Sequence, residues 1–259
     1  MTIVTSVKVK DGLVLGADSV TTISVASGKS KGAVLKTYAN AQKLFRIDSL
    51  PIGIMTWGLG SIGGRSAEGI VKDFQESLPE GTADVEEVAE ALAAYVGPLY
   101  AEAFPGGKGE PLTQAGFIVA GYSDGAQMAE TFEVVLPRDT AAQSLQSEAQ
   151  IGALWRGITD PYSAVALGMT SQVMQELTKR GATKQQIQSL MNRAGMSVIF
   201  DGMPLQDAVN YAVYILEVTI GWAAFQQGER SCGHPLQVAC LRPGHWEWVA
   251  QPSLTLPAR

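Results

Sequence analysis

Two apolar runs that flank a tight turn stand at the start of the chain. The runs are Ile3–Val9 and Leu13–Ala17, and the turn between them contains Asp11 and Gly12. Asp-Gly between two apolar runs is a strong hairpin signal, because glycine adopts the positive φ that the tight turn requires. We therefore predict a buried antiparallel hairpin, whose second strand leads directly into Asp18.

The residue in front of this hairpin is Thr2, which becomes the first residue of the chain once Met1 is removed. An N-terminal threonine carries both a nucleophile, its hydroxyl, and a base, its α-amine. The ordinary pKa of an α-amine is about 7.7–8.0, which suits a general base near neutral pH. With the Asp18 carboxylate at the end of the neighbouring strand, this arrangement indicates hydrolysis of an amide bond.

Composition excludes several classes of protein. The 259 residues are 46% hydrophobic and 17% charged, and no linker-like segment divides them, which favours one domain with much buried surface. A net charge of −6 argues against nucleic-acid binding, which needs a basic patch. The two cysteines, Cys232 and Cys240, argue against a zinc site and for a reduced, cytoplasmic setting. No apolar run reaches the length of a membrane span, and the N-terminus does not have the pattern of a signal peptide.

Strand and helix signals come in blocks along the chain. Alternation in the first strand places Val7 and Val9 on one face and Ser6 and Lys8 on the other. Further strands are predicted at 43–47, 51–57, 115–122, 126–136, 236–241 and 246–250. Helices are predicted at 61–78, 84–104, 161–168, 170–180, 183–194 and 204–225. Because these elements do not alternate singly, we expect two stacked antiparallel sheets with helices outside, with residues 22–40 as a long irregular loop.

Residues later in the chain add to the pattern found at its N-terminus. Lys43 begins the next strand signal, and Gly58 closes the one after it, with Gly60 close behind. Together with Thr2, the hairpin and Asp18, these residues resemble the proteasome β-subunit family over the first third of the chain. The bacterial relatives that it resembles are HslV, Anbu and the betaproteobacterial proteasome homologue.

The C-terminal third agrees with the family pattern more loosely, and three features of the chain depart from it. The family has a late turn that contains an acid and a serine. In this chain Glu229 takes the place of the acid, and Cys232 or Ser231 takes the place of the serine. These residues would support the N-terminal amine. A serine that supports the nucleophile in the family would fall near Gly152, where this chain has none. The segment between residues 18 and 43 is also longer than in proteasome subunits. We therefore expect a divergent bacterial homologue.

The resemblance implies an α+β fold of the N-terminal-nucleophile (Ntn) hydrolase type. This fold is a four-layer αββα sandwich with two stacked antiparallel sheets, formed here by residues 1–259 as a single proteasome-β-like domain. The implied function is that of a threonine-type endopeptidase in a self-compartmentalised homo-oligomer, either a double ring or a helical ring. Its substrate would be a peptide or an unfolded protein, and it would need neither a metal nor an organic cofactor. An ATPase partner is left open.

The resemblance also assigns roles to the matching residues. Thr2 is the implied nucleophile, and the Lys43 ammonium beside it favours the alkoxide. Asp18 would pair with Lys43 and hold it charged and oriented. Gly58 would present its backbone N–H to the developing oxyanion.

A substrate pocket is implied around the residue before the cleaved bond. Its residues would be Thr21, Ala41, Phe45, Thr56 and Gly60. Because the Thr56 side chain is small, the pocket is expected to accept a medium or large apolar side chain.

Two other functions compete with the endopeptidase. One is an amidase of the same fold that acts on a small amide. The other is a catalytically silent scaffold or binding ring, which the missing serine near Gly152 and the unusual turn with Glu229 and Cys232 favour. Retention of Met1 would favour the scaffold strongly, because it would mask the amine of Thr2.

Overall fold

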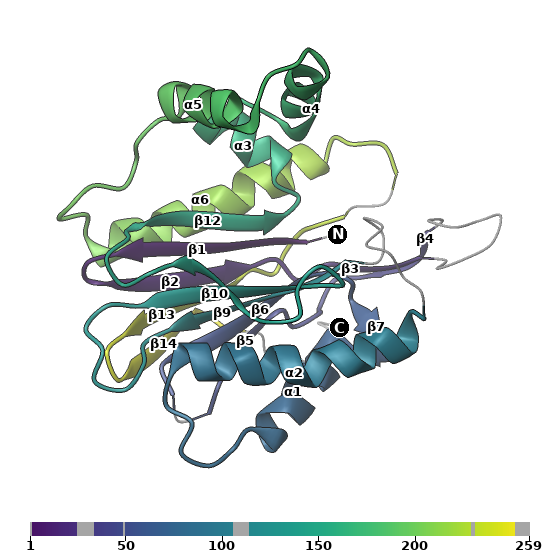
Figure 1. Cartoon of the computed structure of the whole chain (residues 1–259), viewed down its shortest axis with the longest axis vertical. Coiled ribbons are helices and arrows are strands. Elements are labelled where there is room, and N and C mark those ends of the chain that lie inside the picture. The colour runs from purple at the N-terminus through teal and green to yellow at the C-terminus, as the bar shows by residue number, and fades with distance from the viewer. Residues whose placement is uncertain (1, 25–33, 49, 106–113, 229–230, 252–259) are drawn as a thin grey trace, which may run out of the picture.

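The computed structural model describes residues 2–24, 34–48, 50–105, 114–228 and 231–251. Within these residues the chain combines six helices with several antiparallel sheets, as Figure 1 shows. The expected mixed α and β character is therefore confirmed. No helix in the described ranges is long and apolar enough to cross a membrane.

The first sheet holds the N-terminal hairpin in its middle. Its strands pair antiparallel in the order β12, β1, β2, β13 and β14. In that order they span Gly152–Gly157, Ile3–Val9, Gly12–Ala17, Gln237–Arg242 and His245–Ala250. The predicted pairing of the first two strands is confirmed, with Val7 opposite Val14. Every residue of β1 and β2 is buried, because both strands have neighbours on both sides and packed layers on both faces.

The second sheet is also five-stranded and antiparallel. Its strands pair in the order β11, β10, β9, β6 and β5. In that order they span Gln143–Gln146, Glu130–Leu136, Ala115–Gly121, Ile52–Gly58 and Leu44–Arg46. The predicted strands at 43–47, 51–57, 115–122 and 126–136 all lie in this sheet, with ends that differ by a few residues.

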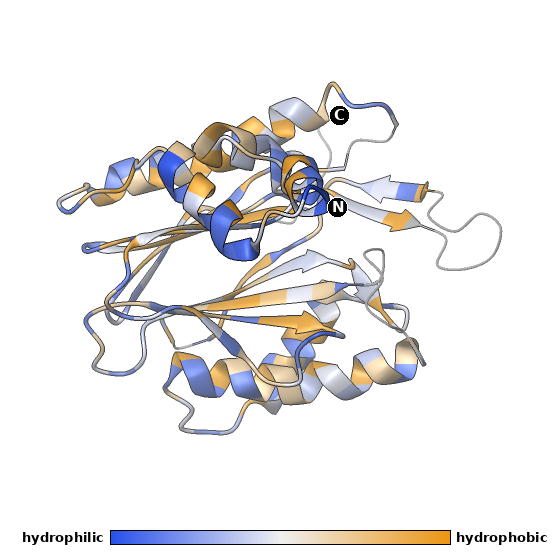
Figure 2. Cartoon of the chain, turned by 45° about the horizontal axis from the view of Figure 1, so that its top comes forward, coloured by the Kyte–Doolittle hydropathy of each residue, from blue (hydrophilic) through white to orange (hydrophobic). Residues whose placement is uncertain are grey.

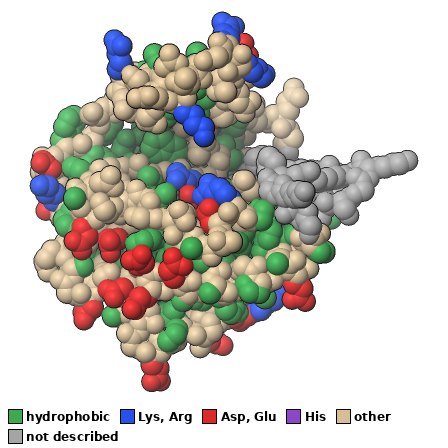
Figure 3. Space-filling view, viewed as in Figure 1, with side chains coloured by type: hydrophobic (Ala, Val, Ile, Leu, Met, Phe, Trp, Pro, Cys, Tyr) green, Lys and Arg blue, Asp and Glu red, His purple; other side chains and the backbone are tan. Residues whose placement is uncertain are grey.

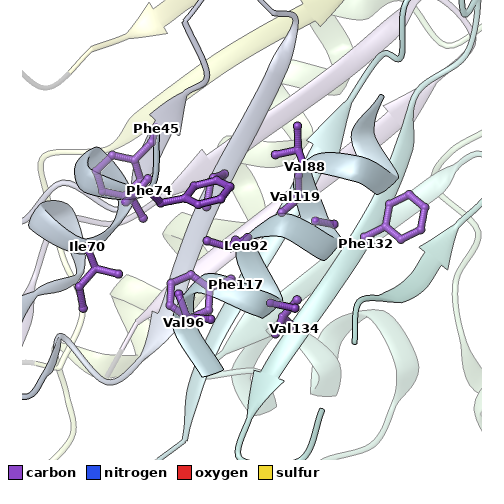
Figure 4. Packing of buried hydrophobic residues seen from close by; sticks show 14 of the residues in the cluster. Phe45, Ile70, Phe74, Val88, Leu92, Val96, Phe117, Val119, Phe132 and Val134 are labelled. Carbon is purple, nitrogen blue, oxygen red and sulfur yellow. The ribbon is translucent and has the colours of Figure 1, made fainter. Parts of the chain in front are cut away.

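Helices α1 (Ala67–Ser77) and α2 (Val85–Ala103) cover the second sheet. Residues at helical spacing on α2, namely Val88, Leu92 and Val96, are fully buried against the alternating residues of β9 and β10. Figure 4 shows these three side chains beside Phe117, Val119 and Val134 of the strands.

The first sheet is covered by α6 (Leu205–Ala223) and by α3 (Asp160–Leu167). Ala212 and Ile215 of α6 are fully buried with Val7 and Val14 of the hairpin. Helices α4 (Ser171–Lys179) and α5 (Lys184–Ala194) lie farther out and carry mostly hydrophilic residues, as Figure 2 shows. They bury only one residue between them, Ile187 of α5.

An apolar cluster fills one part of the space between the sheets. It contains Leu15 from the first sheet and Met55 and Ile118 from the second, all fully buried. Gly53 of β6 allows the sheets to approach closely here, since a Cβ at this position would lie 2.6 Å from Leu15 Cδ1. Burial of these side chains holds the two sheets together.

The part of this space beside β1 and β10 is polar. Lys8 of β1 is 0% exposed, although it is a lysine. Its ammonium donates to three backbone carbonyls, those of Ala129, Ser147 and Glu148, at 2.5, 2.8 and 3.0 Å. These three bonds satisfy every N–H of the ammonium and tie the first sheet to the segments that flank β10 and β11.

An ion pair between a half-buried arginine and a buried glutamate also links the two sheets. Arg156 Nε of β12 donates to Glu133 Oε1 of β10 at 2.7 Å, and the Glu133 side chain is only 4% exposed.

Acidic side chains gather on the face of the molecule shown in Figure 3. Five of them line a shallow hollow beside α2 and β10. They are Asp84, Glu86, Glu87, Glu90 and Glu130. Burial, with Glu148 and Glu86 nearby, raises the pKa of Glu130.

Three parts of the secondary-structure prediction were wrong. The helix predicted from residue 61 begins only at Ala67, because residues 61–66 form a small hairpin of β7 (Ser61–Ile62) and β8 (Arg65–Ser66). Gly63 and Gly64 provide the positive φ values of 58° and 83° that its turn requires. The segment 22–40 is not irregular throughout, since β3 (Thr21–Ser24) pairs with β4 (Val34–Tyr38). Strands β11 and β12 were not predicted at all.

Candidate active site

Asp18 and Lys43 form a buried ion pair beyond the end of β2. Lys43 Nζ lies 2.7 Å from Asp18 Oδ1, and the two side chains are 5% and 0% exposed. The same ammonium donates to the carbonyl of Val20. Burial lowers the pKa of Lys43, and the neighbouring carboxylate of Asp18 opposes this shift. The structure thus brings together the two charged residues that the sequence pattern singled out.

Asp18 also binds three backbone N–H groups. Its Oδ1 accepts from Ile3 at 3.0 Å, and its Oδ2 accepts from Val20 at 3.0 Å and from Gly233 at 3.1 Å. Charge-assisted bonds of this kind hold a carboxylate in one orientation. Because Ile3 is the residue after Thr2, this network fixes Asp18 directly beside the start of β1.

The backbone of Thr2 is held from the other side by the end of β12. The Thr2 carbonyl accepts from the N–H of Ile158 at 2.7 Å, and the residue is only 5% exposed. Gly157 approaches this carbonyl so closely that a Cβ on it would lie 1.9 Å from the oxygen. Its φ of 95° also favours glycine, so the position of Thr2 depends on the absence of a side chain at residue 157.

A cavity of about 420 Å³ opens beside Thr2 and Lys43, which both line it. Four of the five residues expected around a substrate also line it, namely Thr21, Ala41, Thr56 and Gly60. Larger apolar groups come from Tyr38, Trp57 and Leu59, and a carboxylate comes from Glu68. The wall therefore combines one buried cation with mostly small and apolar side chains, which is the usual make-up of a ligand pocket.

Two other expected site residues, Phe45 and Gly58, do not line the cavity. Phe45 does not line the cavity and is buried among α1, α2 and the outer face of the second sheet. Its neighbour Leu44 faces the first sheet instead, since successive residues of a strand point to opposite faces. Gly58 ends β6 beside the cavity wall, with a φ of 83°, and a Cβ there would lie 2.2 Å from the carbonyl of Gln114.

The late turn reaches the site through its backbone. Cys232 is fully buried in an apolar cluster with Ile3 and Leu216, and its Sγ lies 3.8 Å from the carbonyl of Thr219 on α6. Gly233, one residue later, donates to Asp18 and accepts from the N–H of Ser19. Glu229, the other residue expected to support the amine, lies outside the described residues.

Sequence reasoning missed two residues that touch the Asp18–Lys43 pair or its neighbours. Gly233 had a weak signal, the turn before the last two strands. Gln237 had none, because its contacts reach Lys43 and Ser19, which lie 194 and 218 positions away. No group of three His, Cys, Asp or Glu residues among the described positions has the arrangement of a metal site.

Comparison with known proteins shows what this fold is similar to. No protein-family model matches the chain, and no curated protein sequence matches it. Among solved structures, Anbu (ancestral β-subunit) from Yersinia bercovieri aligns with a TM-score of 0.59 at 13% identity, over 95% of this chain and 86% of that one.

Two further Anbu structures give the same result. A Gly-1 mutant of Anbu from Hyphomicrobium sp. strain MC1 aligns with a TM-score of 0.60 at 13% identity, over 99% of this chain and 89% of that one. The helical assembly of the Anbu complex from Pseudomonas aeruginosa aligns with a TM-score of 0.55 at 16% identity, over 93% and 81%. The expected likeness to a divergent proteasome β-type chain is thus confirmed for the fold.

Proposed function

We propose that this protein is a threonine-type endopeptidase whose nucleophile is Thr2, exposed by removal of Met1. The observation that carries the proposal is the convergence of Thr2, Lys43 and Asp18 at one cavity, on a fold similar to that of Anbu. The four-layer αββα arrangement of Ntn hydrolases and a single domain over the chain belong to the same proposal.

In the proposed reaction the Thr2 hydroxyl attacks the scissile carbonyl. The α-amine of the same residue accepts the hydroxyl proton, directly or through water, and later passes it to the leaving amine. The acyl group then forms an ester with Thr2, and water hydrolyses this ester to restore the free hydroxyl. The chain's own residues supply each proton transfer.

Lys43 and Asp18 act together in this scheme. Lys43 is buried and lines the cavity together with Thr2, where its positive charge stabilises the alkoxide that develops on Thr2. Asp18 offsets the cost of burying that charge and holds the ammonium at 2.7 Å. Gly58 remains the proposed backbone donor to the oxyanion of the substrate.

The proposed substrate pocket contains four of the five residues that the sequence predicted. We retain Thr21, Ala41, Thr56 and Gly60, which line the cavity, and leave out Phe45, which does not. Supporting roles for Glu229 and Cys232 remain proposals, and for Cys232 the buried contact with α6 favours packing over chemistry.

Assembly into a homo-oligomer is part of the proposal, with the active sites enclosed. Its support is the similar Anbu structure, which is described as a helical assembly, and large exposed apolar side chains at the end of α6. Trp222 and Phe225 there are 45% and 90% exposed, so an interface that covers them would remove apolar surface from water.

Intact mass measurement tests the proposal directly. The purified protein is weighed before and after incubation with a peptide epoxyketone, which reacts with both the hydroxyl and the amine of an N-terminal threonine. We expect loss of Met1, one adduct per chain, and no adduct on Thr2→Ala. Retained Met1 with no adduct would instead support the scaffold, and turnover of small amides without turnover of peptides would support the amidase.

A further inference from the structure

The side chain of Gln237 forms four hydrogen bonds around the candidate active site. It lies on β13 and is 0% exposed. Its Oε1 accepts from the backbone N–H groups of Lys43 and Leu44, both at 2.9 Å. Its Nε2 donates to Ser19 Oγ at 2.7 Å and to the carbonyl of Ala41 at 2.8 Å.

These four bonds use the full capacity of a glutamine side chain, whose oxygen accepts twice and whose NH₂ donates twice. Glutamate would keep the acceptor oxygen but has no N–H for the carbonyl of Ala41. Methionine fills a similar volume and supplies neither group. The surroundings of Gln237 therefore call for an amide, and not merely for a side chain of this size.

The partners of Gln237 are the neighbours of the proposed catalytic residues. Ser19 follows Asp18, and Leu44 follows Lys43, while Ala41 lines the cavity. On its other side, the carbonyl of Lys43 accepts from the N–H of Thr56 at 2.9 Å. The backbone of Lys43 is thus held by β6 through one bond and by the first sheet through Gln237.

We infer that Gln237 is a positioning residue, which fixes Lys43 relative to Asp18 and so sets where the ammonium meets Thr2. The inference rests on the proposed function, since it gives Lys43 a part in the reaction. It also explains why the amide of Gln237 is buried against Lys43, which lies 194 residues away in the sequence. Without Gln237, the segment 41–44 keeps its bond to β6, the bond from Ala41 to Ser19 and the ion pair of Lys43 with Asp18. It loses the two bonds that hold the backbone of Lys43 and Leu44 to β13.

The test uses Gln237→Met, with Gln146→Met as the matched control. Gln146 is likewise buried, at 6% exposure, but it lies on β11 and outside the cavity wall. We expect the rate constant for epoxyketone adduct formation, at saturating reagent, to fall about 10²-fold in Gln237→Met, the loss typical of a misplaced catalytic group. The control should react at the wild-type rate.

A second readout does not depend on activity. The backbone amides of Lys43 and Leu44 should exchange hydrogen faster in Gln237→Met than in the wild type, because they lose their acceptor. Gln237→Glu, which retains the acceptor oxygen, should keep these two amides protected yet still react more slowly. This variant also decides the matter if Gln237→Met does not fold.

The outcomes separate the two proposals. If the wild-type protein forms no adduct, the proposed endopeptidase fails, and the positioning role falls with it. If the wild-type protein reacts and both Gln237 variants react as fast as the wild type, the proposed function stands and the positioning role is overturned. Unchanged exchange of the Lys43 and Leu44 amides in Gln237→Met would overturn it as well.

Discussion

Lys8 and Lys43 are both buried lysines with a lowered pKa, and they differ in what surrounds them. The Lys8 ammonium binds three backbone carbonyls in the space between the sheets. The Lys43 ammonium binds one carbonyl and the carboxylate of Asp18, and its residue lines a cavity. For both lysines burial is the main reason for the lowered pKa.

This difference shows that burial and a shifted pKa do not by themselves mark a catalytic lysine. All three N–H groups of Lys8 are used in holding the sheets together, so nothing remains for a substrate. Lys43 combines a paired charge with access to a cavity that Thr2 shares. The accessible cavity, and not the titration, separates the proposed functional lysine from the structural one.

The largest expected effect tests this separation on activity. Lys43→Met should slow epoxyketone adduct formation by about 10³-fold or more, because a positioned proton-transfer or charge-stabilising group is removed. Lys8→Met should react at the wild-type rate. Equal losses in the two variants, measured on protein shown to be folded by circular dichroism, would contradict the comparison.

Asp18→Asn tests the carboxylate that distinguishes the two lysines. The variant leaves the Lys43 charge buried without its partner and presents an NH₂ to N–H donors that need an acceptor. We expect a loss of about 3–5 kcal/mol in the free energy of unfolding, as for other broken buried ion pairs. Urea unfolding measures it. Asp124→Asn, in an exposed turn, is the control that should change nothing.

Lys8→Met should lose less stability than Asp18→Asn. The carboxylates that interact with Lys8 are those of Glu130, which is half-buried, and Glu148, which is exposed. The buried carbonyl of Ala129 loses its donor, which costs about 1–3 kcal/mol, whereas those of Ser147 and Glu148 belong to exposed residues. Because methionine restores apolar packing, we expect a net loss of about 2–3 kcal/mol in urea unfolding. A loss as large as that of Asp18→Asn would show that the two lysines are not held as differently as their partners indicate.

The smallest effect concerns the pH dependence of stability. The pKa of Lys8 is lowered from its ordinary value of 10.5, mainly by burial. Between the lowered pKa and 10.5 the unfolded chain binds a proton that the folded chain has lost, so the contribution of Lys8 to stability rises with pH in that window. The stability difference between wild type and Lys8→Met should therefore grow as pH rises toward 10.5. A difference that shrinks would contradict the sign of the shift.

Local patterns predicted the parts of the fold that depend on near neighbours. The hairpin over residues 3–17 was predicted from Asp11 and Gly12, and α2 lies within the helix predicted at 84–104. Strand β12 was missed because Gly152–Gly157 is short, begins and ends with glycine, and becomes a strand only beside β1. The alternation that placed Lys8 and Val7 on opposite faces of β1 gave no sign that both faces would be buried.

The candidate site was predicted where the resemblance was specific. Thr2, Asp18 and Lys43 come together as expected. Phe45 was placed at the pocket, although its side chain faces the helices of the second sheet. Gln237 could not be predicted from the sequence, because hydrogen bonds between distant segments leave no periodic pattern.

The position of β1 inside the first sheet has a consequence for protein synthesis. The ribosome synthesises β1 long before the segments that complete the site. Asp18 accepts a hydrogen bond from the N–H of Gly233, 215 residues later, and the N–H of Lys43 donates to Gln237, 194 residues later. Contacts over such separations form only when both segments have left the ribosome. A nascent chain that does not yet extend past Gln237 therefore lacks these bonds, which delays completion of the proposed active site until this segment has left the ribosome.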